Sequence, residues 1–397
     1  MDFSPETRRK LKNGASLLSF CAPHLHSVAF SVVLPFVPEG TAGVHHLVEH
    51  MFFERAGKMR APEINAAMNA NGSEIDGYTS SGYMCFRFCC RKEVFESQLG
   101  LLFSMLSQRD YGREEFEKVL PVIRNEIFEY HFYDARAGDV LRELWFDSRY
   151  ISPILGEIGY LERLEEDEID GVREKLFTDG MCLFLAGAFS DRDVRAVEAS
   201  FGSMRLEPFS PDPPREEEKV TAPYSRWGRG REWQALVTYH VEKADTELKM
   251  AAHWLRSGLF DGLDAAFFRY FGDNGFQFYS VDGSYNVRGD ELVFSYLCYI
   301  KKRERALFEG LIDGFEKYAE KTDFLRLVRP YLYDNIVLLC DNPERLCSHY
   351  VDAWADHSAP VTLREEYEFC GRFDNARLVR NWKKIASSLR RVFYLGK

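Results

Sequence analysis

The stretch that most constrains this chain is 41–53, where two histidines and a glutamate recur at helical spacing. At 100° per residue, the apolar side chains of such a helix share one side, and His46, Glu49 and His50 share the opposite side. Thr41 is expected to cap the helix at its N-terminus. Because the apolar side would anchor the helix in a core, its polar side would hold two imidazoles one turn apart on a rigid support.

Two imidazoles one helical turn apart are suited to bind a single zinc ion. The order His-x-x-Glu-His is the inverted form of the commoner zinc-protease motif. Three fixed positions can also match by accident in a chain with ten histidines. A surface helix can carry the same residues simply as a solvated face. A third ligand elsewhere in the chain would argue against both alternatives.

Glu126 is the candidate third ligand, 126 − 50 = 76 positions after the second histidine of the motif. The segment 116–127 has apolar residues at helical spacing, and Glu126 lies at the flank of that apolar side. Glu129, about one turn further on, presents a carboxylate on a similar face. Both glutamates are therefore candidates on spacing alone.

The motif together with Glu126 resembles the pitrilysin/insulysin family of zinc peptidases, the inverzincins, which includes the mitochondrial processing peptidases. Residues 43–53 resemble the motif helix of the family, 71–79 resemble the strand after the next helix, and 182–187 resemble the strand that closes the first domain. The resemblance covers 12–205 well and the remainder in outline. It implies an α+β fold with two similar domains, each an antiparallel-rich sheet backed by helices, as in mitochondrial processing peptidase.

The resemblance implies that His46, His50 and Glu126 bind zinc and leave a fourth position for water. The spacing typical of the family favours Glu126 over Glu129. Glu49 would act as the general base and would then deliver the proton to the leaving amine. These roles together imply a zinc metalloendopeptidase.

The resemblance also implies a strand for substrate binding. In the family this strand is a sheet edge, on which the substrate pairs as an added strand through main-chain hydrogen bonds. The matching positions are Ile75, Asp76, Gly77, Tyr78 and Thr79. An ordinary hairpin strand is the alternative for any one of these side chains. Asp76 and Gly77 replace the usual Asn and Ala of the family, so the local preference is expected to differ.

The second half departs from the family at the residues that hold the substrate and the oxyanion. The family uses an Arg and a Tyr about seven residues apart, supplied by the second domain of the opposing half. The nearest stretch has Arg269 and Tyr279 ten positions apart, with Phe278 at the aligned tyrosine position. We interpret this pair as degenerate. The chain is therefore expected to be one subunit of a heterodimer, with a second half-size family subunit that supplies Arg and Tyr.

Residues 207–219 contain four prolines and a run of charges, a composition that excludes both helix and sheet. A chain of 397 residues with 46% hydrophobic and 28% charged residues is long enough for two globular domains. We therefore expect a zinc-carrying peptidase domain at 1–207, a linker at 208–224 and a second, inactive family-like domain at 225–397.

Apolar alternation predicts strands at 16–20 and 27–36, which we expect to pair with each other. The continuous apolar run 181–186 predicts a buried strand. The C-terminal stretch 392–396 is similar to that run. This similarity indicates an internal duplication, although weakly on the sequence alone.

The net charge of −11 argues against nucleic acid as a partner. No apolar run reaches the length that spans a membrane, so no membrane association is expected. Nine cysteines without regular spacing are expected to stay reduced, and the first residues carry no targeting pattern. A cytoplasmic location is therefore the expectation.

The sequence thus predicts a zinc-dependent endopeptidase subunit that cuts short or unfolded peptides. Processing of leader or precursor peptides is one candidate role. One alternative is a non-catalytic scaffold or assembly subunit of the same family, against which the intact zinc and base residues argue. The other alternative is a metal-binding module without proteolysis.

Overall fold

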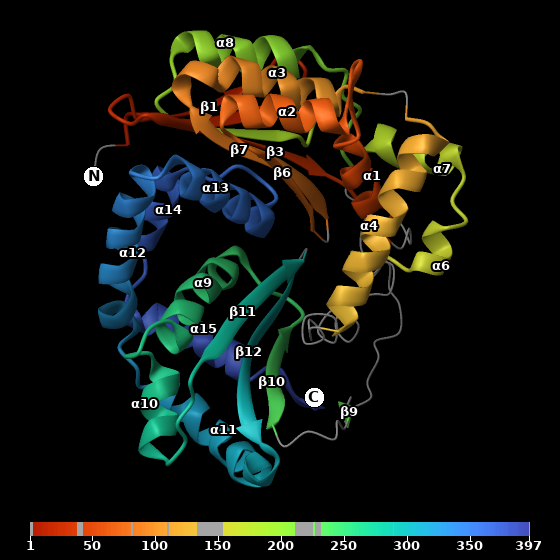
Figure 1. Ribbon diagram of the computed structural model, residues 1–397. Helices are drawn as coiled ribbons and strands as arrows, with labels where there is room; N and C mark the ends of the chain where they lie inside the picture. The colour runs from red at the N-terminus through yellow and green to blue at the C-terminus, as the bar shows by residue number, and fades with distance from the viewer. Residues whose placement is uncertain are drawn as a thin grey trace. The chain divides into compact units, whose positions relative to one another are not determined.

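The structure of the protein, a computed structural model, contains two compact units, each built around one β-sheet (Figure 1). The residues that it describes are 3–37, 43–80, 82–108, 111–132, 154–210, 225–226, 232–288 and 290–396. Most of the predicted linker 208–224 lies outside these residues. Among the described residues, no helix combines the length and the apolar character needed to cross a membrane. The cytoplasmic location stays a prediction.

The first unit contains a six-stranded sheet with the strand order β1-β2-β8-β3-β7-β6. Its strands are β1 (Glu6–Lys10), β2 (Ser16–Cys21), β3 (Ser27–Pro35), β6 (Ile75–Thr79), β7 (Tyr83–Arg91) and β8 (Cys182–Gly187). A separate small hairpin consists of β4 (Arg55–Ala56) and β5 (Met59–Arg60). β6 forms one edge of the six-stranded sheet and pairs antiparallel with β7.

The predicted pairing of strands 16–20 and 27–36 is wrong, although both strands exist. β8 lies between them, parallel to β2 and antiparallel to β3. Every residue of β8 is buried. A continuous apolar run is best accommodated at such a central position, where helices cover both faces of the strand. A short connection between two apolar strands therefore does not imply a hairpin.

Helices cover both faces of the first sheet (Figure 1). On one face lie α2 (Ala61–Asn71), α3 (Phe95–Leu106) and α8 (Asp191–Ser200). On the other face α13 (Pro343–His357) packs against β3, β7 and β8. Beside the β6 edge, α1 (Val44–Phe52) contacts α4 (Arg113–Phe132) and α7 (Glu166–Lys175). Two further helices are α6 (Ile158–Leu161) and α14 (Leu363–Cys370).

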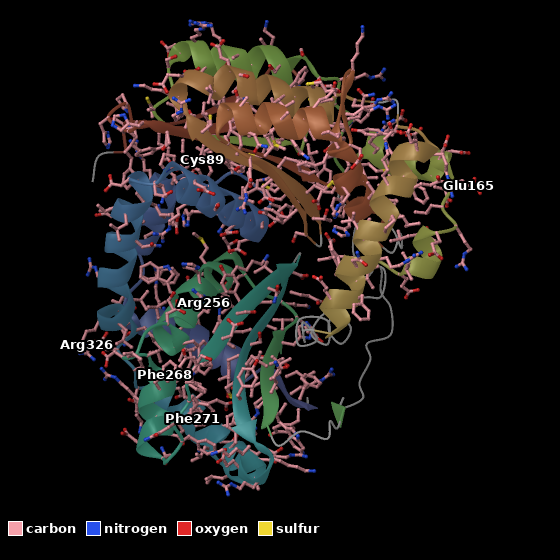
Figure 2. The ribbon with its side chains drawn as sticks, in the orientation of Figure 1. Cys89, Glu165, Arg256, Phe268, Phe271 and Arg326 are labelled. Atoms are coloured by element: carbon pink, nitrogen blue, oxygen red, sulfur yellow. The ribbon has the colours of Figure 1, made fainter. Side chains whose placement is uncertain are left out.

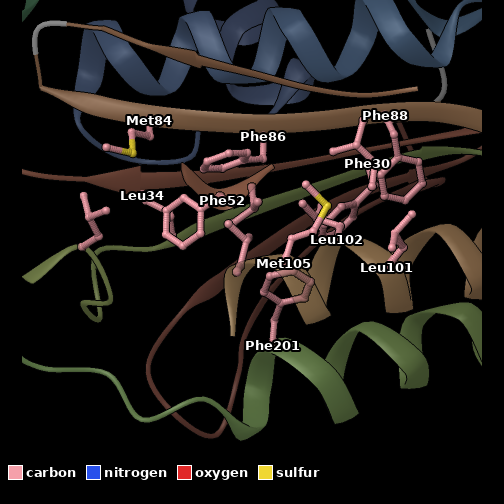
Figure 3. Close-up of a cluster of buried hydrophobic side chains, with 14 of the residues drawn as sticks. Phe30, Leu34, Phe52, Met84, Phe86, Phe88, Leu101, Leu102, Met105 and Phe201 are labelled. Atoms are coloured by element: carbon pink, nitrogen blue, oxygen red, sulfur yellow. The ribbon is translucent and has the colours of Figure 1, made fainter. Parts of the chain in front are cut away.

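The core of the first unit lies between the sheet and the helices α1, α2, α3 and α8. Phe30, Phe52, Phe86, Leu102 and Phe201 belong to one continuous cluster of buried side chains (Figure 3). Each fully buried apolar side chain of this size contributes about 1.5–3 kcal/mol to stability. The apolar side of α1 is part of this cluster, so the polar side of the same helix is rigidly supported.

The second unit contains a five-stranded sheet with the order β11-β12-β10-β13-β9. Its strands are β9 (Ser225–Arg226), β10 (Glu232–Val241), β11 (Val281–Arg288), β12 (Glu291–Lys301) and β13 (Leu389–Gly396). The helices of this unit are α9 (Thr246–Phe260), α10 (Ala266–Asp273), α11 (Arg305–Ala319), α15 (Asn375–Ala386) and, as far as Ile336, α12 (Phe324–Cys340). Phe271 of α10 lies in an aromatic cluster with Phe267 and Phe315 (Figure 2).

The two sheets share one plan. β9, β13, β10, β12 and β11 repeat the order and the pairing directions of β2, β8, β3, β7 and β6. Both edge strands contain Asp-Gly, at Asp76-Gly77 and Asp282-Gly283. A Cβ atom on either glycine would meet an aromatic ring. The prediction of two similar α+β domains is confirmed.

The segment Val337–Glu366 belongs to the first unit by its contacts. It contains α13, which covers one face of the first sheet. This segment lies inside the predicted second domain, 225–397, and its place was not foreseen. A helix that packs on a distant sheet leaves no signal in local composition.

Candidate metal centre

α1 begins at Val44, and its N-cap is Gly43. Thr41, which was predicted to cap the helix, lies outside the described residues. Gly43 has a φ of 82°, in the left-handed region, and a Cβ at this position would collide with the backbone of Gly156. The close approach of a second chain segment thus requires glycine at the helix start.

The structure brings His46, His50 and Glu126 together on facing sides of α1 and α4. The Nε2 atoms of His46 and His50 are 3.1 Å apart. The Oε2 atom of Glu126 lies 3.3 Å from Nε2 of His46 and 3.4 Å from Nε2 of His50. Among the described residues, these three form the one group of His, Cys, Asp and Glu side chains that is close enough to bind a metal ion.

The spacing of the three donor atoms fits a tetrahedral zinc site. Donors about 2.0–2.1 Å from a zinc ion, at tetrahedral angles, lie about 3.3–3.4 Å from one another. The three distances of 3.1, 3.3 and 3.4 Å match these edges closely. Nδ1 of His46 is buried and has no hydrogen-bond partner among the described residues. The outer partner that usually orients a ligating imidazole is therefore not identified for His46.

Electrostatic interactions among the three side chains favour the ionised form of Glu126. Hydrogen bonds with His46 and His50 lower the pKa of Glu126 to about 2. Burial lowers the pKa of His50, but its interactions with Glu126 outweigh that effect and leave the pKa raised. Without a metal ion, Glu126 thus stabilises positive charge on His50. A cation bound at the same point would meet the same negative potential.

Glu129, the alternative ligand, is exposed and is not part of the three-residue group. Glu126 occupies the position that faces both histidines. The geometry therefore separates two candidates that spacing alone left open. The ligand role itself stays a prediction.

Glu49 lies between the two histidines on α1 and is 6% exposed. Burial raises the pKa of its carboxyl group, while a hydrogen bond from Thr79 and the nearby histidines act in the opposite direction. The Thr79 hydroxyl donates to Oε2 of Glu49 at 2.7 Å. A buried carboxylate with a raised pKa beside a metal centre is typical of a general base.

The predicted substrate strand is β6, and its register with β7 runs from Ile75–Phe88 to Thr79–Met84. Because β6 is the edge strand of the sheet, one side of its backbone is available for pairing with another strand. Asp76 is bound to Arg87 at 2.9 Å, so its carboxylate is already partnered. Thr79 faces the candidate base rather than open solvent. Sequence reasoning identified the strand but missed this side-chain contact.

Along the same strand, Tyr78 packs edge-on against Tyr83 with ring centroids 6.0 Å apart. The guanidinium of Arg87 lies over the Tyr78 ring, 5.5 Å from its centre. Ile75 is buried, and Gly77 leaves room for the rings of Phe53 and Phe86. The side chains of this strand are therefore partnered within the first unit, and what it presents outward is mainly backbone.

A cavity of about 420 Å³ opens at the other end of β6. It is lined by residues of β3, β6, β7 and α13, among them Asp76, Arg87, Cys89 and Glu344. None of the three candidate zinc ligands lines it. The candidate metal centre, on α1 and α4, is thus separate from this cavity beside β6.

The predicted Arg/Tyr stretch lies in the second unit, between α10 and β11. Arg269 donates to the carboxylate of Asp264, and Tyr279 is fully exposed. Phe278, at the aligned tyrosine position, packs against Phe267 with ring centroids 5.0 Å apart. The stretch therefore contains an ion-paired arginine and a partly buried phenylalanine that packs on the aromatic cluster.

The second unit also contains a helix that corresponds to α1. When Phe260 of α9 is placed on Phe53, the positions of His46, Glu49 and His50 are taken by His253, Arg256 and Ser257. Arg256, labelled in Figure 2, pairs with Asp261 at 2.8 Å, and the Ser257 hydroxyl donates to the same carboxylate at 2.9 Å. Among the described residues, this helix presents no metal-ligand group.

Residues 38–150 match the sequence profile of the insulinase family, peptidase family M16. This stretch includes the candidate ligands and base on α1 and α4. An uncharacterized zinc protease of Bacillus subtilis is 27% identical over 207 residues, which cover 49% of this chain and 50% of the relative. An uncharacterized zinc protease of Rickettsia felis is 25% identical over 207 residues, with the same coverage. The match thus spans about half the length of these curated relatives.

Solved structures share the fold over nearly the whole chain. A protease from Helicobacter pylori has a TM-score of 0.80 at 13% identity and covers 99% of both chains. The peptidase M16 inactive domain from Pseudomonas fluorescens has a TM-score of 0.79 at 13% identity, with 98% of this chain and 97% of that chain covered. At these identities the likeness shows the fold alone, and an inactive domain shares it. The profile match thus identifies a domain of the insulinase family, peptidase family M16, at residues 38–150, and the similarity to zinc proteases agrees with it.

Proposed function

We propose that this chain is a zinc-dependent endopeptidase subunit that cleaves short or unfolded peptides. The observation that carries the proposal is the convergence of His46, His50 and Glu126, with donor atoms 3.1–3.4 Å apart, beside the buried carboxylate of Glu49. Burying a carboxylate costs free energy and is not required by the fold. A buried carboxylate among histidines therefore points to a functional role.

Each residue of the centre has a distinct task. His46, His50 and Glu126 would hold the metal ion, and zinc, when bound, would polarise the scissile carbonyl and acidify a water molecule. Glu49 would take a proton from the attacking water and pass it to the leaving amine. The position of Glu49 supports this role, because its buried carboxylate lies on the same helix as His46 and His50.

The edge strand β6 supports an extended substrate. A peptide that pairs with β6 as an additional strand would gain main-chain hydrogen bonds and would need no particular sequence. Thr79, at the end of β6, is hydrogen-bonded to Glu49, so a strand added to β6 would run close to the base. A folded domain cannot supply such a free strand. Leader or precursor peptides are therefore suitable substrates.

We further propose that the active form contains a second half-size family subunit. Arg269 is ion-paired with Asp264, and Phe278 is packed among aromatic rings, so neither supplies the expected Arg/Tyr pair. Loss of one donor to the oxyanion typically costs about 2.7–4 kcal/mol, or roughly a hundred- to thousandfold in rate. A partner that supplies the pair would restore that rate.

A non-catalytic scaffold is the competing function, and an inactive domain with this fold exists in Pseudomonas fluorescens. A scaffold would not require three converging metal donors. The donors are present in this chain, which favours catalysis.

The test is hydrolysis of an unstructured peptide by the zinc-loaded chain, alone and with a second half-size family member, in wild type and Glu49→Gln. Glu49→Gln should keep the zinc and the fold and lose nearly all hydrolysis, because only the base is removed. Addition of the partner should raise the wild-type rate strongly. Near-normal turnover of Glu49→Gln, or no hydrolysis by wild type under either condition, would contradict the proposal.

A further inference from the structure

The contact between Thr79 and Glu49 joins the proposed substrate strand to the helix that carries the proposed general base. Thr79 is the last residue of the edge strand β6, and Glu49 lies on α1. The hydroxyl must be the donor in this 2.7 Å contact when Glu49 is ionised, because a carboxylate can only accept. Hydrogen bonds to a charged acceptor are short and about twice as strong as neutral ones.

The bond occupies one oxygen of the carboxylate. Among the described residues, Glu49 accepts a side-chain hydrogen bond at Oε2 and none at Oε1. A free glutamate side chain rotates readily about its last torsion. A donor fixed at Oε2 therefore restricts where Oε1 lies, and Oε1 keeps its lone pairs for a proton.

The chemical type of the donor matters as well. A lysine or arginine at this point would form an ion pair and would depress the basicity of the carboxylate strongly. A neutral hydroxyl holds the oxygen while it lowers the basicity much less.

We propose that Thr79 is the positioning residue of Glu49, and that its hydroxyl fixes the carboxylate for proton transfer while its backbone belongs to the substrate strand. The inference rests on the proposed function, in which Glu49 is the general base. A single residue thus sets the base relative to a peptide that pairs with β6. A misplacement of about 1 Å in such an arrangement can lower a rate roughly a hundredfold.

The competing explanation is that Thr79 only satisfies a buried acceptor and stabilises the fold. The two explanations differ in what a hydroxyl-free variant does. Loss of a merely structural bond would lower stability and leave turnover unchanged in the folded fraction. Loss of positioning would lower kcat in fully folded, zinc-loaded protein.

The experiment compares Thr79→Val, which keeps the shape, with Thr79→Ser, which keeps the hydroxyl. Thr7→Val is the matched control, because Thr7 lies on the opposite edge strand β1 and its hydroxyl is 2.8 Å from that of Ser19. Peptide hydrolysis and zinc content are measured for each. Thr79→Val should lower kcat about 10- to 100-fold with KM nearly unchanged and one zinc retained. Thr79→Ser should recover most of kcat, and Thr7→Val should match wild type.

A second readout is independent of activity. In zinc-free protein, Thr79→Val should lower the thermal midpoint by about 2 °C, because it leaves a buried acceptor without its donor. In a Glu49→Ala background the same change should have almost no effect. An equal shift in both backgrounds would show that Thr79 acts through packing and would overturn the inference.

The activity results distinguish failure of the proposed role of Thr79 from failure of the proposed peptidase function. Unchanged kcat in Thr79→Val, a rise in KM alone, or failure of Thr79→Ser to recover would overturn the role of Thr79 and leave the peptidase intact. A wild-type chain that hydrolyses no peptide even with a partner would remove the proposed function, and this role with it.

Discussion

At the scale of the residue, sequence spacing identified the centre but could not identify its contacts. His46, Glu49 and His50 follow from helical periodicity, since residues one turn apart share a face. Glu126 was one of two candidates until α1 and α4 were seen to face each other. The bond from Thr79 to Glu49 had no sequence signal, because it joins a strand to a helix 30 positions away.

A half-buried histidine outside the centre, His349, gives a prediction about pH. Nε2 of His349 lies 2.6 Å from a carboxylate oxygen of Glu366 in the first unit. Burial alone lowers the pKa of His349, but Glu366, with help from Asp352 and Asp356, leaves it raised. A raised folded-state pKa means that this stabilisation is fully present below the unfolded pKa of about 6.5 and is lost as pH rises through the folded value.

His349→Gln should therefore remove part of the fall in unfolding free energy as the pH rises above about 6.5. Denaturant unfolding of zinc-free protein at several pH values measures this. His24→Gln is the control, because His24 is exposed. If His349→Gln follows wild type across the whole range, the ion pair with Glu366 does not contribute.

At the scale of the element, the sequence patterns predicted where strands and helices form. They did not predict which elements pack against one another. The buried strand predicted at 181–186 exists as β8, yet it separates the two strands that were expected to pair. Apolar runs report burial, whereas strand order is decided by packing between distant segments. For the same reason, α13 could not be assigned to the first sheet from its sequence.

The junction of β8 and α13 gives a prediction about stability. Gly187 ends β8 with a φ of 110°, and a Cβ there would meet the backbone oxygen of Ser27 and would lie 2.9 Å from Pro343. Gly187→Ala should therefore destabilise the first unit by about 1–3 kcal/mol. Gly100, inside α3, has open space around its Cβ position. Gly100→Ala should stabilise by about 0.5–1 kcal/mol.

Thermal or denaturant unfolding of the two alanine variants measures both effects. The opposite signs are the essential point, since the two changes are chemically identical. Equal shifts for Gly187→Ala and Gly100→Ala would mean that the crowding and backbone strain at Gly187 are relieved without cost.

At the scale of the whole molecule, the two units share one sheet topology, and among the described residues only the first unit contains a candidate metal centre. The two sheets share strand order and pairing directions. The helix that corresponds to α1 has Arg256 and Ser257 at the positions of Glu49 and His50, both bound to Asp261. Among the described residues, α9 thus carries an internal ion pair, whereas α1 carries two of the candidate metal ligands. The duplication, only weakly indicated by the sequence, is evident from the topology.

This asymmetry fixes the number of metal ions. The account predicts one zinc per chain, held in the first unit, although the chain contains two copies of the fold. Elemental analysis of purified protein after zinc loading and removal of excess metal gives the ratio directly.

The most direct test of the central claim is this zinc content in three proteins: wild type, Glu126→Gln and Glu129→Gln. Wild type and Glu129→Gln should each hold one zinc per chain, and Glu126→Gln should hold far less, because only Glu126 faces both histidines. Two zinc ions in wild type, or loss of zinc in Glu129→Gln with retention in Glu126→Gln, would contradict the account.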